Sequence, residues 1–291
     1  SFGTMNVVLF GSKGILGSAI KEALEDKGFL VYAYSSNTCD ITNTKQLEAV
    51  FNDKRDLNFI INCAAYTKVD DAELECDKAE QLNAVAVKNL AKYSKKLSAT
   101  FIHFSTDYVF DGKSEISYKE EDSCNPINFY GQTKLNGETN CIKSCDDYYI
   151  FRVQWLYGQT GNHFVATMKK LFKQRKEIQV VNDQFGSPTF TNTLSKYVLS
   201  VMQKRPQPGV YHCTDKGITT WYDFCKTIAK YEGFEGQIIP VSSNEFKRPA
   251  ERPLNGVLNC DKFDNAVDCE RQHWKKSLEL YYNHVYKEQK V

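Results

Sequence analysis

Long hydrophobic runs are missing from this chain of 291 residues, and so is any excess of charge of one sign. Polar residues interrupt the apolar stretches before the roughly 20 residues that a membrane-spanning helix needs, so we expect no membrane span. The 37 Lys and Arg residues nearly balance the 36 Asp and Glu residues, and like charges occur only in short pairs such as Lys95-Lys96. This balance argues against a nucleic-acid-binding surface and against a polybasic membrane anchor.

Paired cysteine motifs are also lacking, and we expect no secretory signal. The ten cysteines are scattered without a CxxC pair, and several lie in apolar patterns, where cysteine behaves as a small buried hydrophobe. Cys141 and Cys145 could face each other on a helix, but no nearby His or Cys completes a zinc set, so no metal site is expected. We therefore expect reduced thiols and a cytoplasmic location. Ser1 to Thr4 look like a cloning remnant and are left out of the fold prediction.

What the sequence does contain is an alternation of strands and helices. Strands are expected at 6–10, 29–35, 59–65, 100–105 and 149–155, and helices at 15–27, 44–52, 78–97 and around Tyr130. Alternation of this kind with short connections predicts an α/β fold with a doubly wound parallel sheet, covered by helices on both faces.

After about Gly158 the pattern changes to shorter elements. Helices are expected at 164–174, 193–204, 221–231 and 275–286, with strands at 178–181 and 209–214. We therefore predict a nucleotide-binding domain over residues 5–158 and a smaller substrate-binding lobe over residues 159–291. A segment around 185–215 is expected to return to the main sheet.

A glycine-rich turn follows the first expected strand. The run Gly11-Ser-Lys-Gly14-Ile-Leu-Gly17 spells GxxGxxG between that strand and a helix. Glycines at these places permit a tight turn, close approach to a pyrophosphate and close helix–strand packing, and the helix N-terminus attracts phosphate. A lone triad is weak, but this strand–turn–helix context predicts a Rossmann dinucleotide site. The residues expected to bind the cofactor here are Gly11, Ser12, Lys13, Gly14, Ile15 and Leu16.

The end of the second strand bears on the choice of cofactor. Tyr34-Ser-Ser-Asn37 has no carboxylate to bind the ribose 2′-hydroxyl of NAD, which favours NADPH with Ser35, Ser36 and Lys13 as phosphate donors. No arginine stands there to clamp a phosphate, so NADH stays open. Asp40 and Ile41 are expected at the adenine edge. For Asp40, capping of the next turn is an equally good interpretation.

Tyr130 and Lys134 are the most informative pair in the chain. Residues four apart lie on one face of a helix, and an ammonium beside a phenol would lower the pKa of the tyrosine from about 10. Such a tyrosine can exchange a proton with a carbonyl oxygen near neutral pH. The spacing alone is common on exposed helix faces. Together with the glycine-rich turn and Ser105-Thr106, it indicates the active site of a short-chain dehydrogenase/reductase.

Two further strand ends supply candidate site residues. Asn62-Cys-Ala-Ala-Tyr66 ends the third strand, and we expect Cys63, Ala64, Ala65 and Tyr66 against the cofactor, with tight core packing as the alternative for the alanines. Ser105 and Thr106 end the fourth strand, where a hydroxyl can bind the reacting carbonyl or only cap a turn. His103 is expected to be a core residue. Asp107 and Asp111 are expected to hold loop backbone.

Several of these segments resemble the dTDP-4-dehydrorhamnose reductase family. They are 62–73 (NCAAYTKVDDAE), 105–112 (STDYVFDG), 126–138 (PINFYGQTKLNGE), 152–158 (RVQWLYG), 183–189 (DQFGSPT) and Arg252-Pro253. The match runs in order over nearly the whole chain. Members of this family are extended short-chain reductases that use a nicotinamide cofactor to reduce the C4 ketone of a nucleotide-linked 6-deoxy-hexulose.

The resemblance implies roles for individual residues. Tyr130 would be the general acid, Lys134 its electrostatic partner and ribose ligand, and Thr106 the hydroxyl at the carbonyl. The sugar-nucleotide pocket would include Thr67, Val69, Thr106, Asp107, Tyr108, Tyr130, Trp155 and Arg252, with Arg252 directed at the diphosphate. A surface ion pair is the alternative for Arg252. Gln154 departs from the small hydroxyl residue usual in the family. Some members bind Mg²⁺ between subunits, but no carboxylate cluster here locates such a site.

Two relatives of this family compete as interpretations. Epimerase/reductases that make UDP-rhamnose or GDP-fucose place a cysteine beside the catalytic Ser or Thr, whereas this chain has Ser105-Thr106-Asp107. The regulatory subunit of methionine adenosyltransferase binds NADP without catalysis, but it lacks the acidic segment present here at 69–73. The sequence favours the reductase, leaves dTDP and UDP open as the nucleotide, and is compatible with a homodimer.

Overall fold

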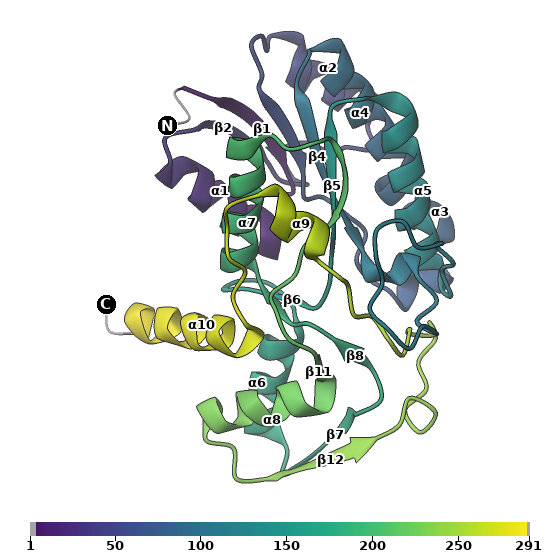
Figure 1. Cartoon of the computed structure of the whole chain (residues 1–291), viewed down its shortest axis with the longest axis vertical. Helices are drawn as coiled ribbons and strands as arrows, with labels where there is room; N and C mark the ends of the chain where they lie inside the picture. Colours follow the sequence, from purple (N-terminus) through teal and green to yellow (C-terminus); the bar gives the residue numbers. More distant parts are fainter. Residues whose placement is uncertain (1–3, 290–291) are drawn as a thin grey trace.

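The structure is a computed structural model that describes residues 4–289 (Figure 1). Residues 1–3, which hold most of the expected cloning remnant, lie outside the described residues, as do residues 290–291. Within the described part, no helix is both long enough and apolar enough to cross a membrane.

A six-stranded parallel sheet forms the larger part of the molecule, in the order β10-β5-β4-β3-β1-β2. Its strands are β1 (Asn6–Phe10), β2 (Leu30–Tyr34), β3 (Phe59–Asn62), β4 (Thr100–Thr106), β5 (Tyr148–Val153) and β10 (Gly209–His212). The order reverses between β1 and β3, which is where ligands bind in doubly wound sheets. The predicted fold class is confirmed.

Helices cover both faces of this sheet (Figure 1). On one face lie α1 (Ile15–Asp26), α7 (Thr191–Lys204) and α9 (Asp261–Ala266), and on the other α2 (Thr44–Asn52), α4 (Ala86–Lys96) and α5 (Phe129–Ser144). Successive residues of β1 show why both faces are covered. Val7 and Leu9 enter one apolar core, whereas Val8 and Phe10 enter the other, because side chains alternate along a strand.

The helix expected at 78–97 is interrupted. The structure has α3 (Cys76–Glu80), a π-helical turn η2 (Gln81–Val85) and then α4. The wide turn brings the Asn83 carbonyl against Gly137 of α5, where a Cβ atom would collide with it. The Asn83 side chain accepts from Tyr66 N at 2.8 Å and donates to the Thr133 hydroxyl at 3.1 Å. The turn therefore ties the loop after β3 to α5.

The chain after β5 builds a second layer of shorter elements. These are β6 (Leu156–Tyr157), α6 (Phe164–Gln174), β7 (Glu177–Val181), β8 (Phe185–Gly186), β9 (Thr189–Phe190), β11 (Thr219–Thr220), α8 (Trp221–Glu232), β12 (Gln237–Val241) and α10 (Trp274–Gln289). An aromatic-rich core that includes Tyr157, Phe190, Phe224 and Trp274 holds this part together. The chain between β9 and β11 returns to the main sheet. There α7 packs on one face of the sheet, and β10 pairs with β5. A domain boundary at residue 158 stays a prediction.

Candidate active site

The glycine-rich turn has the geometry that each of its glycines suggests. Gly11 has a φ of +73°, and a Cβ atom there would lie 2.5 Å from the backbone nitrogen of Ala64. A Cβ atom on Gly17 would collide with the Gly11 carbonyl, so Gly17 permits close packing of α1 on the turn. At Gly14 a Cβ atom would meet only the Gly11 oxygen, at 3.4 Å. The backbone at Gly14 is therefore open toward a ligand.

A cavity of about 780 Å³ extends from this turn to Tyr130. It lies at the carboxyl ends of β1, β2, β3 and β4, where the strand order reverses. Of the predicted cofactor residues, it is lined by Gly11, Lys13, Gly14, Ile15, Leu16, Ser35, Asp40, Ile41, Cys63, Ala64, Ala65, Ser105, Tyr130 and Lys134. Ser12 and Tyr66 do not line it. The Ser12 backbone nitrogen donates to Tyr34 O at 3.1 Å, and the Tyr66 hydroxyl donates to Glu75 at 3.1 Å.

Two buried hydroxyls of this cavity are available to a polar ligand. Among the described residues, neither Ser35 Oγ nor Ser105 Oγ has a hydrogen-bond partner, although both are buried. Buried polar groups are rarely left unsatisfied, so this pair suits a ligand rich in hydroxyl and phosphate oxygens. Asp40 accepts from the Thr42 backbone nitrogen at 2.9 Å, as its turn-capping interpretation requires. It also lines the cavity, and its contact with adenine stays a prediction.

The catalytic candidates meet where β4 ends and α5 begins. Asn128 caps α5 by accepting from Gly131 N at 2.8 Å, and a Cβ atom on Gly131 would collide with the Tyr108 carbonyl. This close approach lays the Tyr130 ring edge-on against the Tyr108 ring, with the centroids 5.8 Å apart. Thr106 is the last residue of β4, and its hydroxyl interacts with the Tyr130 phenol. The structure thus brings Tyr130, Lys134 and Thr106 together.

The electrostatics differ from the sequence prediction. Burial raises the pKa of Tyr130 above its usual range, and neighbouring Tyr108 and Asp107 add to the rise. The expected lowering by Lys134 is not found, because the Lys134 ammonium donates instead to the Phe104 carbonyl at 2.7 Å. Burial lowers the pKa of Lys134 itself to about 8. The phenol therefore stays protonated at neutral pH, the state a proton donor requires.

Asp107 lies beneath this cluster. The Thr106 hydroxyl donates to Asp107 Oδ1 at 3.3 Å and accepts from Tyr108 N at 3.1 Å. Burial raises the pKa of Asp107 to about 7. Gln154, the residue that departs from the family pattern, is buried here and donates to Gly256 O at 2.6 Å while accepting from Ser187 N at 2.8 Å. Gln154 therefore links the residue after β5 to the backbone at Ser187 and Gly256.

A second cavity, of about 720 Å³, is lined in part by Tyr108. It combines aromatic and basic side chains, among them Tyr108, Phe164, Trp221, Phe246, Arg175, Arg248 and Arg252. Trp155 does not line either cavity, but its ring stacks on Trp221 with the centroids 3.7 Å apart. Thr67 lines the first cavity, and Val69 lines neither of the two.

Arg252 is held in an ion pair with Asp70, and only a tenth of its side chain is exposed. The alternative of an ion pair is therefore met, but the pair is not on the open surface. Arg248 also contacts the Asp70 carboxylate at 3.0 Å, and both arginines lower the pKa of that carboxyl. The segment that carries these arginines is thus tied to the loop after β3.

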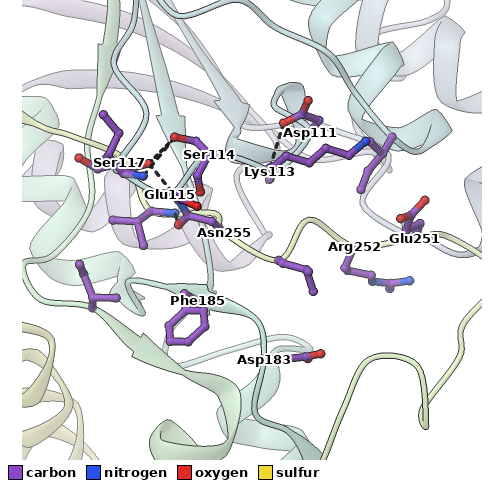
Figure 2. Close-up of a pocket in the computed structure, with 16 residues that line it drawn as sticks. Asp111, Lys113, Ser114, Glu115, Ser117, Asp183, Phe185, Glu251, Arg252 and Asn255 are labelled. Carbon is purple, nitrogen blue, oxygen red and sulfur yellow. Dashed lines mark hydrogen bonds between the residues drawn. The ribbon is translucent and has the colours of Figure 1, made fainter.

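Arg252 also borders a third cavity, of about 770 Å³, which Figure 2 shows with Phe185 and Asn255 among the side chains around it. Asp111 lies on its rim and accepts from Lys113 N at 3.0 Å, so it holds loop backbone as expected. His103 is buried in the sheet as expected, with Nδ1 3.2 Å from Asn62 Nδ2, but its Nε2 has no hydrogen-bond partner among the described residues. Within residues 4–289, His, Cys, Asp and Glu side chains form no group of three that could hold a metal ion.

Comparisons with known proteins agree with this geometry. The family model described as "RmlD substrate binding domain" matches residues 5–287. The chain belongs to the RmlD family. A dTDP-4-dehydrorhamnose reductase of Escherichia coli K12 is 35% identical, over 97% of this chain and 98% of its own length.

Two solved structures of proteins named dTDP-4-dehydrorhamnose reductase resemble the chain closely. A dTDP-4-dehydrorhamnose reductase of Bacillus anthracis, solved in complex with NADP, has a TM-score of 0.93 and 36% identity, covering 97% of this chain and 99% of that one. A Clostridium acetobutylicum protein of the same name has a TM-score of 0.93 and 39% identity, covering 97% and 100%.

Several residues that line the first and second cavities were not predicted from the sequence. Gly161 and Asn162 line the first cavity from the loop before α6. Gly161 has a φ of +80°, and a Cβ atom there would lie 2.5 Å from the Ile15 side chain. Phe164, Trp221 and Arg248 line the second cavity. The glycine was a readable signal for a sharp turn. The others come from elements whose neighbours are set only by tertiary folding.

Proposed function

We propose that the protein is an NADPH-dependent reductase of the C4 ketone of dTDP-4-dehydro-L-rhamnose, which yields dTDP-L-rhamnose. The observation that carries the proposal is that Tyr130 and Lys134 line the dinucleotide-type cavity. Tyr130 also interacts with Thr106 at the end of β4 and packs against Tyr108, which lines the aromatic and basic cavity. The names of the relatives support the same reaction.

The first cavity fits a dinucleotide. The open backbone at Gly14 and the start of α1 would hold the pyrophosphate, and the hydroxyls of Ser35 and Ser105 would gain partners. Ser35, Ser36 and Lys13 would hold a ribose 2′-phosphate, which is why we favour NADPH over NADH. The bound cofactor supplies a hydride. The name of the Bacillus anthracis structure, with NADP, supports this choice.

The residues of the chain supply the proton and the polarisation. The Tyr130 phenol, protonated at neutral pH because burial raises its pKa, would give its proton to the carbonyl oxygen. The Thr106 hydroxyl would donate a hydrogen bond to the same oxygen. Lys134, which lines the first cavity and donates to Phe104 O, would bind ribose hydroxyls of the cofactor.

The second cavity would take the nucleotide. Its aromatic side chains suit a pyrimidine base, and Arg252, with Arg248 beside it, suits a diphosphate because a guanidinium gives parallel charge-assisted hydrogen bonds. Tyr108, whose phenol lies near both arginines, would line the path from the base to the sugar. We extend the proposal to a cytoplasmic location, since the ten cysteines are free thiols.

Turnover tests the proposal. Purified protein is mixed with NADPH and either dTDP-4-dehydro-L-rhamnose or its UDP counterpart, and NADPH oxidation is followed together with product identity. We expect reduction at C4, with the dTDP sugar preferred. Tight NADPH binding without turnover of either sugar would instead indicate a non-catalytic binding protein. Product epimerised at another carbon would indicate an epimerase/reductase.

A further inference from the structure

The Thr106 hydroxyl has one proton to donate and more than one group near it that could accept that proton. A threonine hydroxyl has one proton to donate and two lone pairs to accept with. Tyr108 N already donates to it at 3.1 Å, the Asp107 Oδ1 oxygen lies 3.3 Å away, and the Tyr130 phenol interacts with it. A carboxylate at Asp107 can only accept, so it takes the Thr106 proton. A carboxylic acid there can donate, which releases the Thr106 proton for another acceptor.

We propose that Asp107 is a positioning residue that must carry a proton for catalysis, because only the acid form turns the Thr106 hydroxyl outward as a donor to the substrate carbonyl. The inference rests on the proposed reductase function and adds a residue to it. In this state Thr106 accepts from both Asp107 and Tyr108 N, and its own proton points to the carbonyl oxygen. When Asp107 is ionised, the Thr106 hydroxyl donates to the Asp107 carboxylate and no longer donates to the substrate carbonyl.

The surroundings of Asp107 favour the acid form. Only 3% of the residue is exposed, and a Cβ atom on Gly256 would lie 2.5 Å from Asp107 Oδ2, so backbone covers this oxygen. The Gln154 amide, fixed by Gly256 O and Ser187 N, acts in the opposite direction, because its interaction with the carboxyl lowers the pKa of Asp107, but the effect of burial is larger.

The titratable groups that face Asp107 are phenols. Tyr108 lies next in the chain and Tyr130 faces it from α5, and burial raises the pKa of both. The cations Arg248 and Arg252 act on the neighbouring Tyr108 rather than on Asp107. Burial outweighs the hydrogen bonds that oppose it, and the pKa of Asp107 stands at about 7. The donor is therefore lost as the pH rises through neutrality.

The pH dependence of kcat tests the inference in wild type, Asp107→Asn and Thr106→Val. We expect wild-type kcat to fall above about pH 7, roughly tenfold per pH unit. The Asn amide donates at every pH, so Asp107→Asn should keep kcat at pH 6.5 within about threefold and lose this limb. Its remaining fall should begin near pH 8, where Lys134 loses its charge. Thr106→Val should lose roughly 10²–10³-fold at all pH values.

Asp111→Asn is the matched control, since Asp111 lies on the same loop with a lowered pKa and should leave the wild-type limb unchanged. The proposal is overturned if Asp107→Asn keeps the limb near pH 7, or if it is as inactive as Thr106→Val. NADPH affinity should not change, because Asp107 does not line the first cavity.

A readout without turnover separates this inference from the proposed function. Infrared difference spectra of ¹³C-aspartate-labelled protein follow the stretch of a protonated carboxyl. A band that titrates near pH 7, disappears in Asp107→Asn and shifts in Thr106→Val would support the hydrogen bond between acid and hydroxyl even if no sugar nucleotide is reduced. An Asp107 that is ionised at pH 6 would overturn the inference whatever the substrate.

Discussion

At the residue scale, Tyr130 and Lys134 show that helical spacing gives neighbours but not contacts. The two residues are one turn apart on α5, yet the lysine ammonium donates to Phe104 O while the phenol packs against Tyr108. Each side chain is set by the strand or loop that it meets. The roles of these two residues can therefore be tested separately.

Tyr130→Phe should retain NADPH binding and lose most turnover. The substitution removes only the phenolic oxygen, and loss of a general acid typically costs ~10²–10⁴-fold in rate. Single-turnover rates at pH 7, with the dissociation constant of NADPH measured alongside, check this expectation. Turnover close to that of wild type would remove Tyr130 from the mechanism.

Ser36→Asp should shift the cofactor preference from NADPH toward NADH. Ser36 lies exposed at the edge of the first cavity, beside the buried Ser35 hydroxyl. A carboxylate there would accept from a ribose 2′-hydroxyl and repel a 2′-phosphate. The ratio of kcat/KM for the two cofactors measures the shift, with Asn37→Asp as a control one position further along. A wild-type preference for NADH would contradict the premise.

At the scale of elements, the segment after β12 closes the second cavity by crossing back to the loop after β3. Asp70 holds it at three points, since it accepts from Ala250 N at 3.0 Å and pairs with Arg248 and Arg252. Arg252 is nearly enclosed, whereas half of the Arg248 side chain is exposed. Contacts of the enclosed arginine should therefore matter more for binding.

Arg252→Ala should raise KM for the sugar nucleotide by roughly 10- to 100-fold, since hydrogen bonds to charged groups contribute about 1.5–3 kcal/mol. KM for NADPH should change little. Arg248→Ala is the control, and we expect a smaller rise because its guanidinium is already solvated. Asp70→Asn distinguishes positioning from direct contact by loosening the segment while keeping both arginines. Equal effects of Arg252→Ala on both substrates would place Arg252 outside the site.

At the scale of the whole molecule, buried carboxyls set part of the pH dependence of stability. Asp215 is fully buried between α7 and β9, and it accepts from Tyr197 at 2.6 Å and from Phe190 N at 3.0 Å. Burial outweighs these bonds and raises its pKa from 3.8 to about 6. The folded state then binds the proton more tightly than the unfolded state. This group's contribution to stability is therefore present below about pH 4 and is lost as the pH rises to about 6.

Asp215→Asn should flatten that dependence by up to roughly 3 kcal/mol. Urea unfolding of wild type and variant at half-unit steps from pH 4 to pH 7 checks it. Asp111→Asn offers a control of opposite sign, because its pKa is lowered and its contribution is lost as the pH falls. An unchanged slope in Asp215→Asn would contradict the assigned protonation.

Much of the main sheet could be predicted, because its strands are mostly apolar runs, and β1, β2 and β4 end at or directly before Gly11, Ser35 and Thr106. The short elements that follow β5 were harder to predict from the sequence. Pro240 lies inside β12, and proline argues against a strand unless the strand has a free edge, as β12 has beyond its pairing with β7. Strands of two residues, such as β8 and β11, show no periodicity at all.

The candidate site was predicted where motifs lie next to one another in sequence, and missed where folding brings distant elements together. The π-helical turn at 81–85 depends on the fit of Asn83 against Gly137, which no local pattern announces. Trp221 reaches the second cavity from the start of α8, and the lysine contact with Phe104 depends on the spacing of α5 and β4. Tertiary packing decides each of these.

The pairing of β10 with β5 has a consequence for synthesis on the ribosome. The chain leaves β5 at Val153 and returns at Gly209, so roughly 55 residues must be made before the sheet gains its last strand. At roughly 5–20 residues per second, β5 waits for several seconds with one row of backbone groups unpaired. Such an open edge is where nascent chains pair with one another. Crowded polysomes are therefore the setting in which this protein is most prone to aggregate, before its final strand has emerged.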